Sequence, residues 1–253
     1  MDSMETRREA IVAFVNEKGN ISFNQLKTEF SNVSEMTLRT DLKILDEEKK
    51  IVRVHGGAKS VNVVMGTDDL FGKRAVRNIS AKQKIAEKAI TLLKPHTSVY
   101  LDSGSTTTMM ARNFPDQPQI IYTTGLSCAM ELAKLTQPKV TIPGGALNRY
   151  SMSVCGIEGI KELEAVNFDI VFMGITCYSK ETGFTCGASE EAKLKQAALK
   201  NADLKVILLD SSKIDTRGIF SICNLEDVDI IVSDDELTAE FLRDAVSAGV
   251  TVL

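Results

Sequence analysis

The sequence predicts an α/β protein in which a small helical unit precedes a mostly parallel open sheet. Over the last two thirds of the chain, short apolar runs alternate with helical patterns, which is typical of βα units on a parallel sheet. The first sixty residues instead carry three helical patterns and one hairpin pattern. With 253 residues, 43% of them hydrophobic, the chain can bury two unequal cores. We therefore expect domains at 1–60 and 78–253, joined by a linker at 61–77.

The first sixty residues predict three helices followed by a hairpin. A helix from about Met4 to Lys18 has an apolar face and stops at a Gly-Asn pair. The second helix opens at Ser22, where Gln25 completes a capping box. Ser34 is the expected N-cap of the third helix, which runs to about residue 48. The stretch "IVRVHGGAKSV" supplies two β-prone runs around a Gly-Gly turn. Helix, helix, turn, helix and hairpin is the order of a winged helix-turn-helix.

The third helix has two different faces. At 100° per residue, its three leucines lie on one side and predict a buried face. The opposite face is polar and carries Met36, Arg39, Thr40 and Lys43. One face is therefore available to pack against the domain, and the other to meet a partner.

Seven β-prone runs predict the strands of the larger domain. They are "SVYL", "IIYT", "KVTI", "DIVFMG", "KVILL", "DIIVS" and "VTVL". One helical pattern precedes them at 81–93, and others lie between them at 126–135, 189–201 and 237–248. Near-continuous apolar strands of this kind are typical of a sheet covered on both faces.

A loop rich in hydroxyl groups follows the first of these strands. The stretch "YLDSGSTTTMMA" places Gly104, Ser105, Thr106 and Thr107 between a strand and the next helix. Ligands of open α/β sheets bind at this carboxyl edge, and the free amides of a helix start favour an anion. An ordinary turn with a hydroxyl N-cap is the alternative.

Other predicted strands end in similar loops. Their sequences are "TTG" at 123–125, "PGG" at 143–145, "MG" at 173–174 and "DSSK" at 210–213. Because the carboxyl ends of parallel strands meet at one edge, we expect these loops to converge. Lys213 is then available as a point charge for a phosphate group.

The motifs at both ends of the chain resemble the DeoR family of bacterial transcription regulators. The N-terminal match consists of Ser34, Thr37, Arg39, Asp41, Leu42, Leu45 and the "RVHGGA" run at 53–58. The C-terminal match starts with Arg74, Asn78 and Lys82 and ends with the "DSSK" run. The resemblance covers nearly the whole chain. It implies a sensor domain related to ribose-phosphate isomerase and coenzyme A transferases, which binds a phosphorylated sugar or a related metabolite.

The resemblance implies a DNA-reading third helix and a wing. A recognition helix places its N-terminal residues against base edges in the major groove. Arg39 is the expected bidentate contact to guanine, and phosphate contacts fix position without reading sequence. Thr40 stands where the family usually has a second arginine. The predicted DNA-binding residues are Arg7, Ser34, Glu35, Met36, Thr37, Arg39, Thr40, Lys43, Arg53 and His55.

The predicted effector site combines the loop residues with the matches to the sensor domain. Thr124 stands where relatives commonly have asparagine, and "GITCYS" at 174–179 also departs from the family pattern. The predicted effector-binding residues are Asp102, Gly104, Ser105, Thr106, Thr107, Thr124, Gly144, Gly145, Gly174, Glu191, Lys195 and Lys213.

Charge and composition limit the possible partners. The net charge is −4, but residues 1–84 carry 15 basic against 12 acidic side chains, a balance of +3. Residues 85–253 carry 15 basic against 22 acidic side chains, a balance of −7. We therefore expect a nucleic-acid partner to bind the N-terminal part of the chain. No apolar run spans a bilayer, which predicts a cytoplasmic protein without a membrane partner. The five cysteines show no CxxC spacing, so we predict neither a metal site nor a cofactor.

Three functions remain open at this stage. The best supported is a repressor of carbohydrate genes that binds double-stranded operator DNA as a homodimer or homotetramer. A sugar-phosphate isomerase with an accessory DNA-binding domain is the enzymatic alternative, since carboxylates and lysines at the loops supply acid and base groups. The third is a plain protein-interaction module. With only two histidines and no Ser-His-Asp triad at the loops, we predict no catalytic residue and no enzyme.

Overall fold

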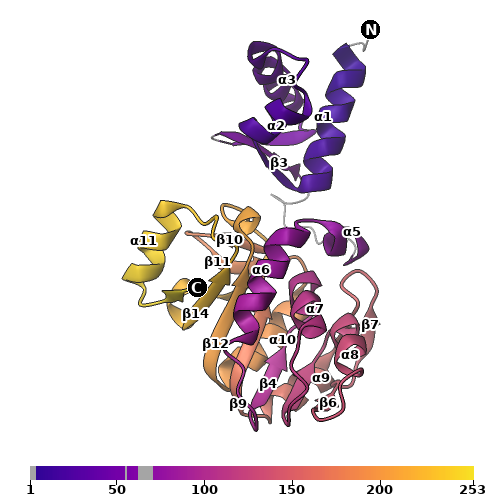
Figure 1. The fold of residues 1–253 in the computed structure, drawn as a ribbon, viewed down its shortest axis with the longest axis vertical. Coiled ribbons are helices and arrows are strands. Elements are labelled where there is room, and N and C mark those ends of the chain that lie inside the picture. Colours follow the sequence, from indigo (N-terminus) through magenta and orange to yellow (C-terminus); the bar gives the residue numbers. More distant parts are fainter. Residues whose placement is uncertain (1–3, 55, 62–70) are drawn as a thin grey trace.

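The computed structural model describes residues 4–54, 56–61 and 71–253, which form a small upper lobe and a large lower lobe in Figure 1. The small lobe contains three helices and a three-stranded antiparallel sheet in the order β1-β3-β2. Its elements are α1 (Met4–Lys18), β1 (Asn20–Ser22), α2 (Phe23–Glu29), α3 (Glu35–Glu47), β2 (Ile51–Val54) and β3 (Gly57–Ser60). The winged helix-turn-helix order is therefore confirmed.

The helix caps follow the predicted pattern. Ser22 and Gln25 form the full capping box of α2, and the Ser34 side chain accepts from the Thr37 amide at the start of α3. The leucines of α3 are fully or nearly fully buried against α1 and α2. Strand β1 was not predicted, because its three residues are recognised only by their pairing with β3.

Seven parallel strands form the central sheet of the large lobe, and each of the seven predicted runs supplies one of them. A mostly parallel open α/β sheet is thus confirmed. In spatial order the strands are β15 (Thr251–Val252), β14 (Ile230–Ser233), β12 (Ala202–Leu209), β9 (Phe168–Gly174), β4 (Ser98–Leu101), β5 (Ile120–Thr123) and β6 (Lys139–Thr141).

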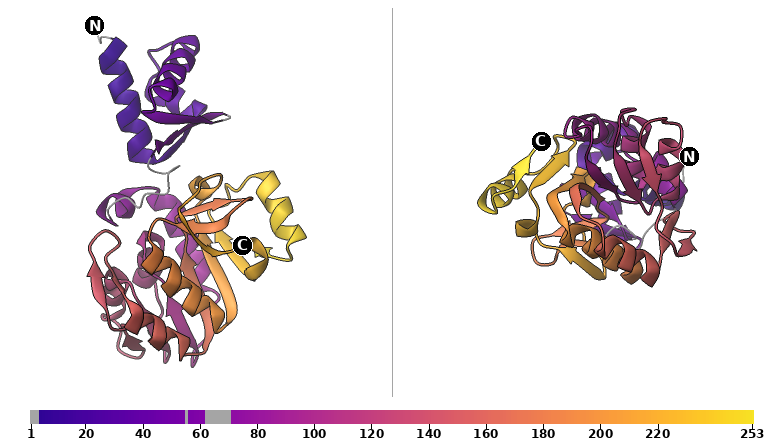
Figure 2. Two further views of the ribbon diagram at one scale, coloured as in Figure 1. Left: turned by 180° about the vertical axis from the view of Figure 1, so that it is seen from behind. Right: turned by 90° about the horizontal axis from the view of Figure 1, so that it is seen from below.

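Helices cover both faces of this sheet. On one face α6 (Ile79–Ile90), α7 (Ser105–Arg112) and α8 (Leu126–Leu132) bury the side chains of one apolar cluster. On the other lie α9 (Ile157–Glu164), α10 (Ser189–Lys200) and α11 (Ala239–Ser247). Figure 2 shows α9 and α10 over the sheet when the molecule is seen from behind. Helix α9 was not predicted.

Several small strands and turns lie at the carboxyl edge of the sheet. Strands β7 (Ala146–Asn148) and β8 (Ser153–Cys155) form a hairpin, and the second sheet has the order β10-β11-β13. These elements were not predicted, because strands of three or four residues carry little periodicity. The second sheet consists of β10 (Cys177–Ser179), β11 (Gly183–Cys186) and β13 (Phe220–Cys223), and the 3-10 turns are η1 (Ser211–Lys213) and η2 (Leu225–Asp227).

The strand order reverses between β4 and β9. From β4 the chain proceeds to β5 and β6 on one side, and then returns to β9, β12, β14 and β15 on the other. Open α/β sheets form their ligand crevice at such a reversal, outside the carboxyl ends of the strands. Among the several predicted loops, the sheet order therefore points to those after β4 and β9 as the place of the ligand crevice.

A short helix lies inside the segment predicted as a linker. Helix α5 (Phe71–Val76) precedes α6, and the Phe71 amide donates to the Tyr150 carbonyl in the β7–β8 hairpin over 2.7 Å.

None of the helices in the described part of the chain has the length and apolar character of a membrane span.

Candidate functional site

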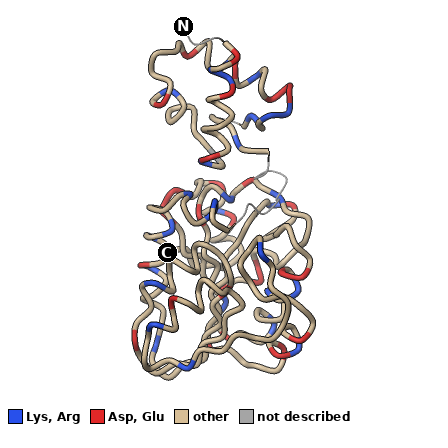
Figure 3. The backbone as a smooth tube through the Cα atoms, turned by 90° about the vertical axis from the view of Figure 1, so that its right-hand side faces the viewer, with Lys and Arg blue, Asp and Glu red and all other residues tan. Residues whose placement is uncertain are grey.

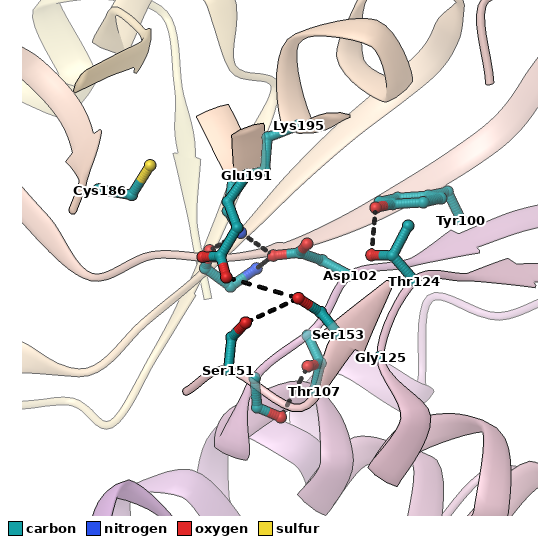
Figure 4. A network of polar contacts seen from close by, with 12 residues as sticks. Tyr100, Asp102, Thr107, Thr124, Gly125, Ser151, Ser153, Cys186, Glu191 and Lys195 are labelled. Atoms are coloured by element: carbon teal, nitrogen blue, oxygen red, sulfur yellow. Dashed lines mark hydrogen bonds and ion pairs between the residues drawn. The ribbon is translucent and has the colours of Figure 1, made fainter. Parts of the chain in front are cut away.

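A buried ion pair lies beneath the reversal point. The Lys195 ammonium on α10 donates to the Asp102 carboxylate, which follows β4, and also to the Gly174 carbonyl at the end of β9 over 2.9 Å. The same carboxylate accepts from the Gly174 amide over 3.0 Å. Asp102 and Lys195 are 1% and 4% exposed, and Figure 4 shows them pointing toward one another. The pair joins β4, β9 and α10 under the site.

The electrostatics of this pair keep Lys195 charged. Burial by itself lowers the pKa of Lys195, but the nearby Asp102 carboxylate and its hydrogen bond outweigh burial and raise that pKa above its ordinary value. A lysine held in the charged state cannot serve as a general base. The pair therefore acts as structure that fixes the loops above it.

A polar cleft lies directly above the ion pair. The start of α7 contributes Gly104, Ser105 and Thr106, whose amides have no acceptor within the helix. The loop after β9 contributes Gly174, and the loop after β12 contributes Lys213. The residues that line the cleft are Arg74, Arg77, Lys82, Ser103, Gly104, Ser105, Thr106, Ser151, Gly174, Ile175, Thr176, Glu191, Lys195, Asp210 and Lys213.

The cleft brings together most of the predicted effector residues. Gly104, Ser105, Thr106, Gly174, Glu191, Lys195 and Lys213 all line it, and Asp102 lies just below. The hydroxyl loop after β4 and the lysine after β12 therefore face one space, as the sheet reversal requires.

Four predicted effector residues lie elsewhere. The Thr107 side chain donates back to the Gly104 carbonyl over 3.0 Å, and the Thr124 hydroxyl lies 3.1 Å from the Tyr100 hydroxyl in the core (Figure 4). Gly144 and Gly145 lie in the turn before β7. A Cβ on Gly145 would lie only 2.4 Å from the Cys155 carbonyl oxygen, so this glycine permits the close approach of β8. We assign these four residues to the support of the cleft.

Four basic side chains around the cleft make it a site for an anion. Arg74 from α5, Arg77, Lys82 from α6 and Lys213 from η1 all line it. Buried polar groups in proteins are nearly always hydrogen-bonded. The Nε and Nη2 atoms of Arg74 are buried, yet they have no hydrogen-bond partner among the described residues. A guanidinium with unsatisfied donors at a cleft is suited to a carboxylate or a phosphoryl group.

The sequence motifs point to part of this basic group. Arg74 and Lys82 belong to the family-type match, but neither was among the predicted site residues, and Arg77 was in the predicted linker. Their contribution depends on α5 and the start of α6 folding over the cleft, and no local pattern in the sequence reveals that packing.

The β7–β8 hairpin forms the opposite wall. The Glu191 carboxylate accepts from Asn148 Nδ2 over 3.2 Å and from Ser153 Oγ over 3.4 Å. Ser151 Oγ lies 2.7 Å from Ser153 Oγ and also lines the cleft (Figure 4). Hydroxyl, amide and carboxylate groups of this kind suit the hydroxyls of a polyol.

Lys82 is the titratable group of the cleft near neutral pH. It is 4% exposed, and two of its N–H groups donate to the carbonyls of Arg74 and Arg77. Burial lowers its pKa from 10.5 to about 7, and the neighbouring cations Lys213, Arg74 and Arg77 add to that effect against the attraction of Asp210. The unfolded chain keeps this lysine protonated to about pH 10. The free energy of unfolding therefore rises with pH between about 7 and 10.

Anion binding is expected to draw a proton onto Lys82. A bound anion favours the charged ammonium, so sulfate affinity should be constant below pH 7 and fall above it by up to about tenfold per pH unit. Sulfate serves as the probe because it does not titrate in this range. Calorimetry at pH 8 in two buffers of different ionisation enthalpy should show an uptake approaching one proton. Lys84→Met, two residues along α6 and exposed, should leave the uptake unchanged, whereas Lys82→Met should abolish it.

The outer face of α3 carries the predicted DNA-reading side chains. Met36, Arg39, Thr40 and Lys43 are exposed there. The Arg39 guanidinium lies 4.1 Å from the centre of the Phe23 ring at the start of α2, a cation–π contact that holds it at the surface. The Glu35 carboxylate is bound by Lys27 over 2.6 Å, which lowers the pKa of Glu35.

The remaining predicted DNA contacts differ in their surroundings. Ser34 caps α3, and its hydroxyl lies 2.8 Å from that of Thr37. Arg53 is exposed on β2, and His55 lies outside the described residues. Arg7 and Arg8 both bind the buried Asp41 carboxylate, over 2.7 Å and 2.8 Å. Arg7 therefore holds α1 against α3, which is a structural role beside the predicted phosphate contact.

Comparison with known proteins identifies both lobes. The DeoR-like helix-turn-helix domain matches residues 7–64, and the DeoR C terminal sensor domain matches residues 77–235. The chain belongs to the DeoR family. Curated relatives share its full length: the HTH-type transcriptional regulator GlpR of Haloferax volcanii is 32% identical over 98% of this chain and 96% of its own. A putative aga operon transcriptional repressor of Escherichia coli O157:H7 is 28% identical over 98% and 92%.

Solved structures resemble this DeoR-family chain more distantly. Ribose 5-phosphate isomerase A of Methanocaldococcus jannaschii is 20% identical over 53% of each chain, with a TM-score of 0.39. Translation initiation factor eIF-2B of Pyrococcus horikoshii OT3 is 16% identical over 62% of this chain and 63% of its own, with a TM-score of 0.44.

The family membership decides between a regulator and an enzyme. The curated relatives are named as transcriptional regulators and repressors, so this DeoR-family protein is a regulator of transcription and not an isomerase. The site agrees, since the buried carboxylate of Asp102 is committed to Lys195.

Proposed function

We propose that this DeoR-family protein represses genes of carbohydrate metabolism and that a phosphorylated sugar or related metabolite, bound in the cleft, alters its hold on operator DNA. One observation carries the proposal: Arg74, whose buried Nε and Nη2 atoms have no hydrogen-bond partner among the described residues, lines a basic cleft at the sheet reversal of a chain with a helix-turn-helix domain. Relatives named for the lactose phosphotransferase system, in Staphylococcus aureus, and for the aga operon favour a carbohydrate pathway.

The cleft divides chemically into two parts. Arg74, Lys82, Lys213 and the first amides of α7 suit the phosphoryl group. Ser151, Glu191 and the backbone around Gly174 suit the sugar hydroxyls on the other side. This arrangement favours a phosphorylated polyol over either a free sugar or inorganic phosphate.

Operator binding is expected to need more than one copy of the chain. Residues 1–60 carry ten basic and ten acidic side chains, and Figure 3 shows both signs interspersed on the small lobe. Nonspecific affinity comes mainly from the neutralisation of phosphates, so one such domain binds DNA weakly. A homodimer or homotetramer supplies the missing affinity through multivalency.

A panel of sugar phosphates and their unphosphorylated counterparts tests the effector. A phosphorylated sugar should raise the unfolding temperature of the sensor domain, and its unphosphorylated counterpart should not. Each stabilising compound is then added to the protein on an operator duplex selected from a random library. Stabilisation by free sugars alone, or no effect of any binding compound on the duplex, would contradict the proposal.

Arg39→Ala should relax the base preference at one operator position, at a cost of about 1–3 kcal/mol for the preferred base. The reason is the loss of a bidentate contact in the major groove. Lys43→Ala, on the same exposed face, is the matched comparison. It should weaken binding evenly across sequences and lower the slope of affinity against salt by about one. Fluorescence anisotropy with single-base variants measures both, and unchanged selectivity in Arg39→Ala would refute this docking.

A further inference from the structure

Arg77 belongs to the cleft and to the contact between the two lobes at once. Arg77 lines the cleft together with Arg74 and Lys82. Its guanidinium also donates from Nε to the Glu17 carbonyl over 2.9 Å and from Nη2 to the Asn16 carbonyl over 2.8 Å. Both carbonyls lie in the last turn of α1, so one side chain connects the anion site with the DNA-binding lobe.

The end of α1 gains from this contact. The last four carbonyls of an α-helix receive no hydrogen bond from within the helix. A cation at this end also interacts favourably with the helix dipole. Gly19 ends the helix and its amide satisfies the Val15 carbonyl over 2.8 Å. Arg77 satisfies the next two carbonyls, so it caps α1 from outside the DNA-binding lobe.

The cleft is too small to take an effector as it stands. Its enclosed space is about 40 Å³, and a single water needs about 10–15 Å³ of such space. A sugar phosphate therefore requires lining side chains to move. Two of the acceptors of the Arg77 guanidinium are neutral carbonyls, and a phosphate group would add charge–charge attraction and bidentate geometry, which a carbonyl does not supply.

A second link between the lobes lies outside the cleft. The Lys59 ammonium, on β3 of the wing, donates to the carbonyls of Ile214 over 2.5 Å and Asp215 over 3.2 Å. Lys59 is 4% exposed. Both of its acceptor carbonyls come directly after the "DSSK" run at 210–213. Beside these links, an open space of about 610 Å³ lies between the two lobes.

We propose that a phosphoryl group in the cleft and the C-terminal carbonyls of α1 compete for the Arg77 guanidinium. An occupied cleft then frees the end of α1, while Lys59 keeps the wing attached and acts as the pivot. The competition gives the effector a differential affinity for two orientations of the DNA-binding lobe, which every ligand-driven switch requires. This inference rests on the proposed function, because it assumes that the cleft binds an anion.

Hydrogen exchange measured on the full-length protein tests the competition. The probe is inorganic phosphate, compared with chloride at equal ionic strength. In the wild type, saturating phosphate should speed exchange about five- to tenfold at the backbone amides of the last turn of α1 and Gly19, since two hydrogen bonds to a charged group are lost. Arg77→Ala should show the faster exchange without phosphate and no further change with it.

Two further variants separate the roles of the arginine. Arg77→Lys keeps the charge but lacks the planar fork, so it should bind phosphate and still leave α1 exchanging fast. Arg243→Ala, on an exposed residue of α11, should behave as the wild type does.

The outcomes are distinct for the two proposals. Thermal stabilisation of the wild type by phosphate without any change at α1 overturns the competition alone, as does an Arg77→Ala variant that keeps the wild-type response. If phosphate neither stabilises the wild type nor alters its exchange, the anion site itself fails and the competition fails with it.

Discussion

Lys195→Met is expected to lower the unfolding temperature of the sheet domain by about 10 °C. The substitution leaves the Asp102 carboxylate buried without its cation, and breaking a buried pair in this way costs about 3–5 kcal/mol. In a domain of this size each 1 kcal/mol shifts the unfolding temperature by about 2–4 °C. The loops after β4 and β9 lose their common anchor at the same time, so effector binding should weaken as well.

Differential scanning calorimetry measures this effect, because the transition of the sheet domain dominates the heat absorbed. Lys193→Met is the matched control, since that lysine is exposed two residues earlier on α10 and its loss should change the unfolding temperature little. Asp102→Asn in the Lys195→Met background should recover part of the loss by removing the uncompensated charge. A Lys195→Met protein as stable as the Lys193→Met protein would show that the pair does not hold the site together.

Arg74→Met is expected to have opposite effects on stability and on binding. The Nε and Nη2 atoms of Arg74 are buried without a partner among the described residues, and such unsatisfied donors cost about 1–3 kcal/mol each in the free protein. Their removal should therefore raise the unfolding temperature in the absence of effector. Because the proposed site assigns these same donors to the anion, phosphate affinity should fall at least tenfold, by roughly 1.5–3 kcal/mol for the charge-assisted bonds.

Thermal unfolding with and without inorganic phosphate measures both effects in one experiment. Lys73→Met changes an exposed basic residue on the same helix, α5, and should alter neither property by more than about 0.5 kcal/mol. If Arg74→Met lowered stability and left phosphate binding intact, Arg74 would be a packing residue and the anion site would lie elsewhere.

Local patterns in the sequence were sufficient for the elements themselves. The seven apolar runs became seven strands, and Ser22 and Ser34 cap the helices that follow them. The two faces of α3 also separated as its 3.6-residue period requires. These features depend on neighbours within one turn or one strand, which is why residue type and spacing alone predict them. Elements of three residues, such as β1 and β7, were not predicted, because only their pairing with another strand defines them.

The anion site could be predicted only in part. Ser105, Thr106 and Lys213 follow strands, and parallel strands end at one edge, so their meeting in the cleft is a consequence of the fold class. Thr124 and Thr107 also come shortly after strands, yet their side chains turn toward Tyr100 and Gly104. Which way a loop side chain points is decided by its packing, and the sequence does not encode it locally.

The sequence by itself determined the two kinds of domain, their order and the edge of the sheet that carries polar loops, since these follow from periodicity and chain connectivity. Tertiary structure alone decided that Arg74, Arg77 and Lys82 close the cleft and that Arg77 reaches the end of α1. The contacts between Arg77 and α1 join residues sixty or more positions apart. Their interaction energy therefore depends on a geometry that exists only when both lobes have folded.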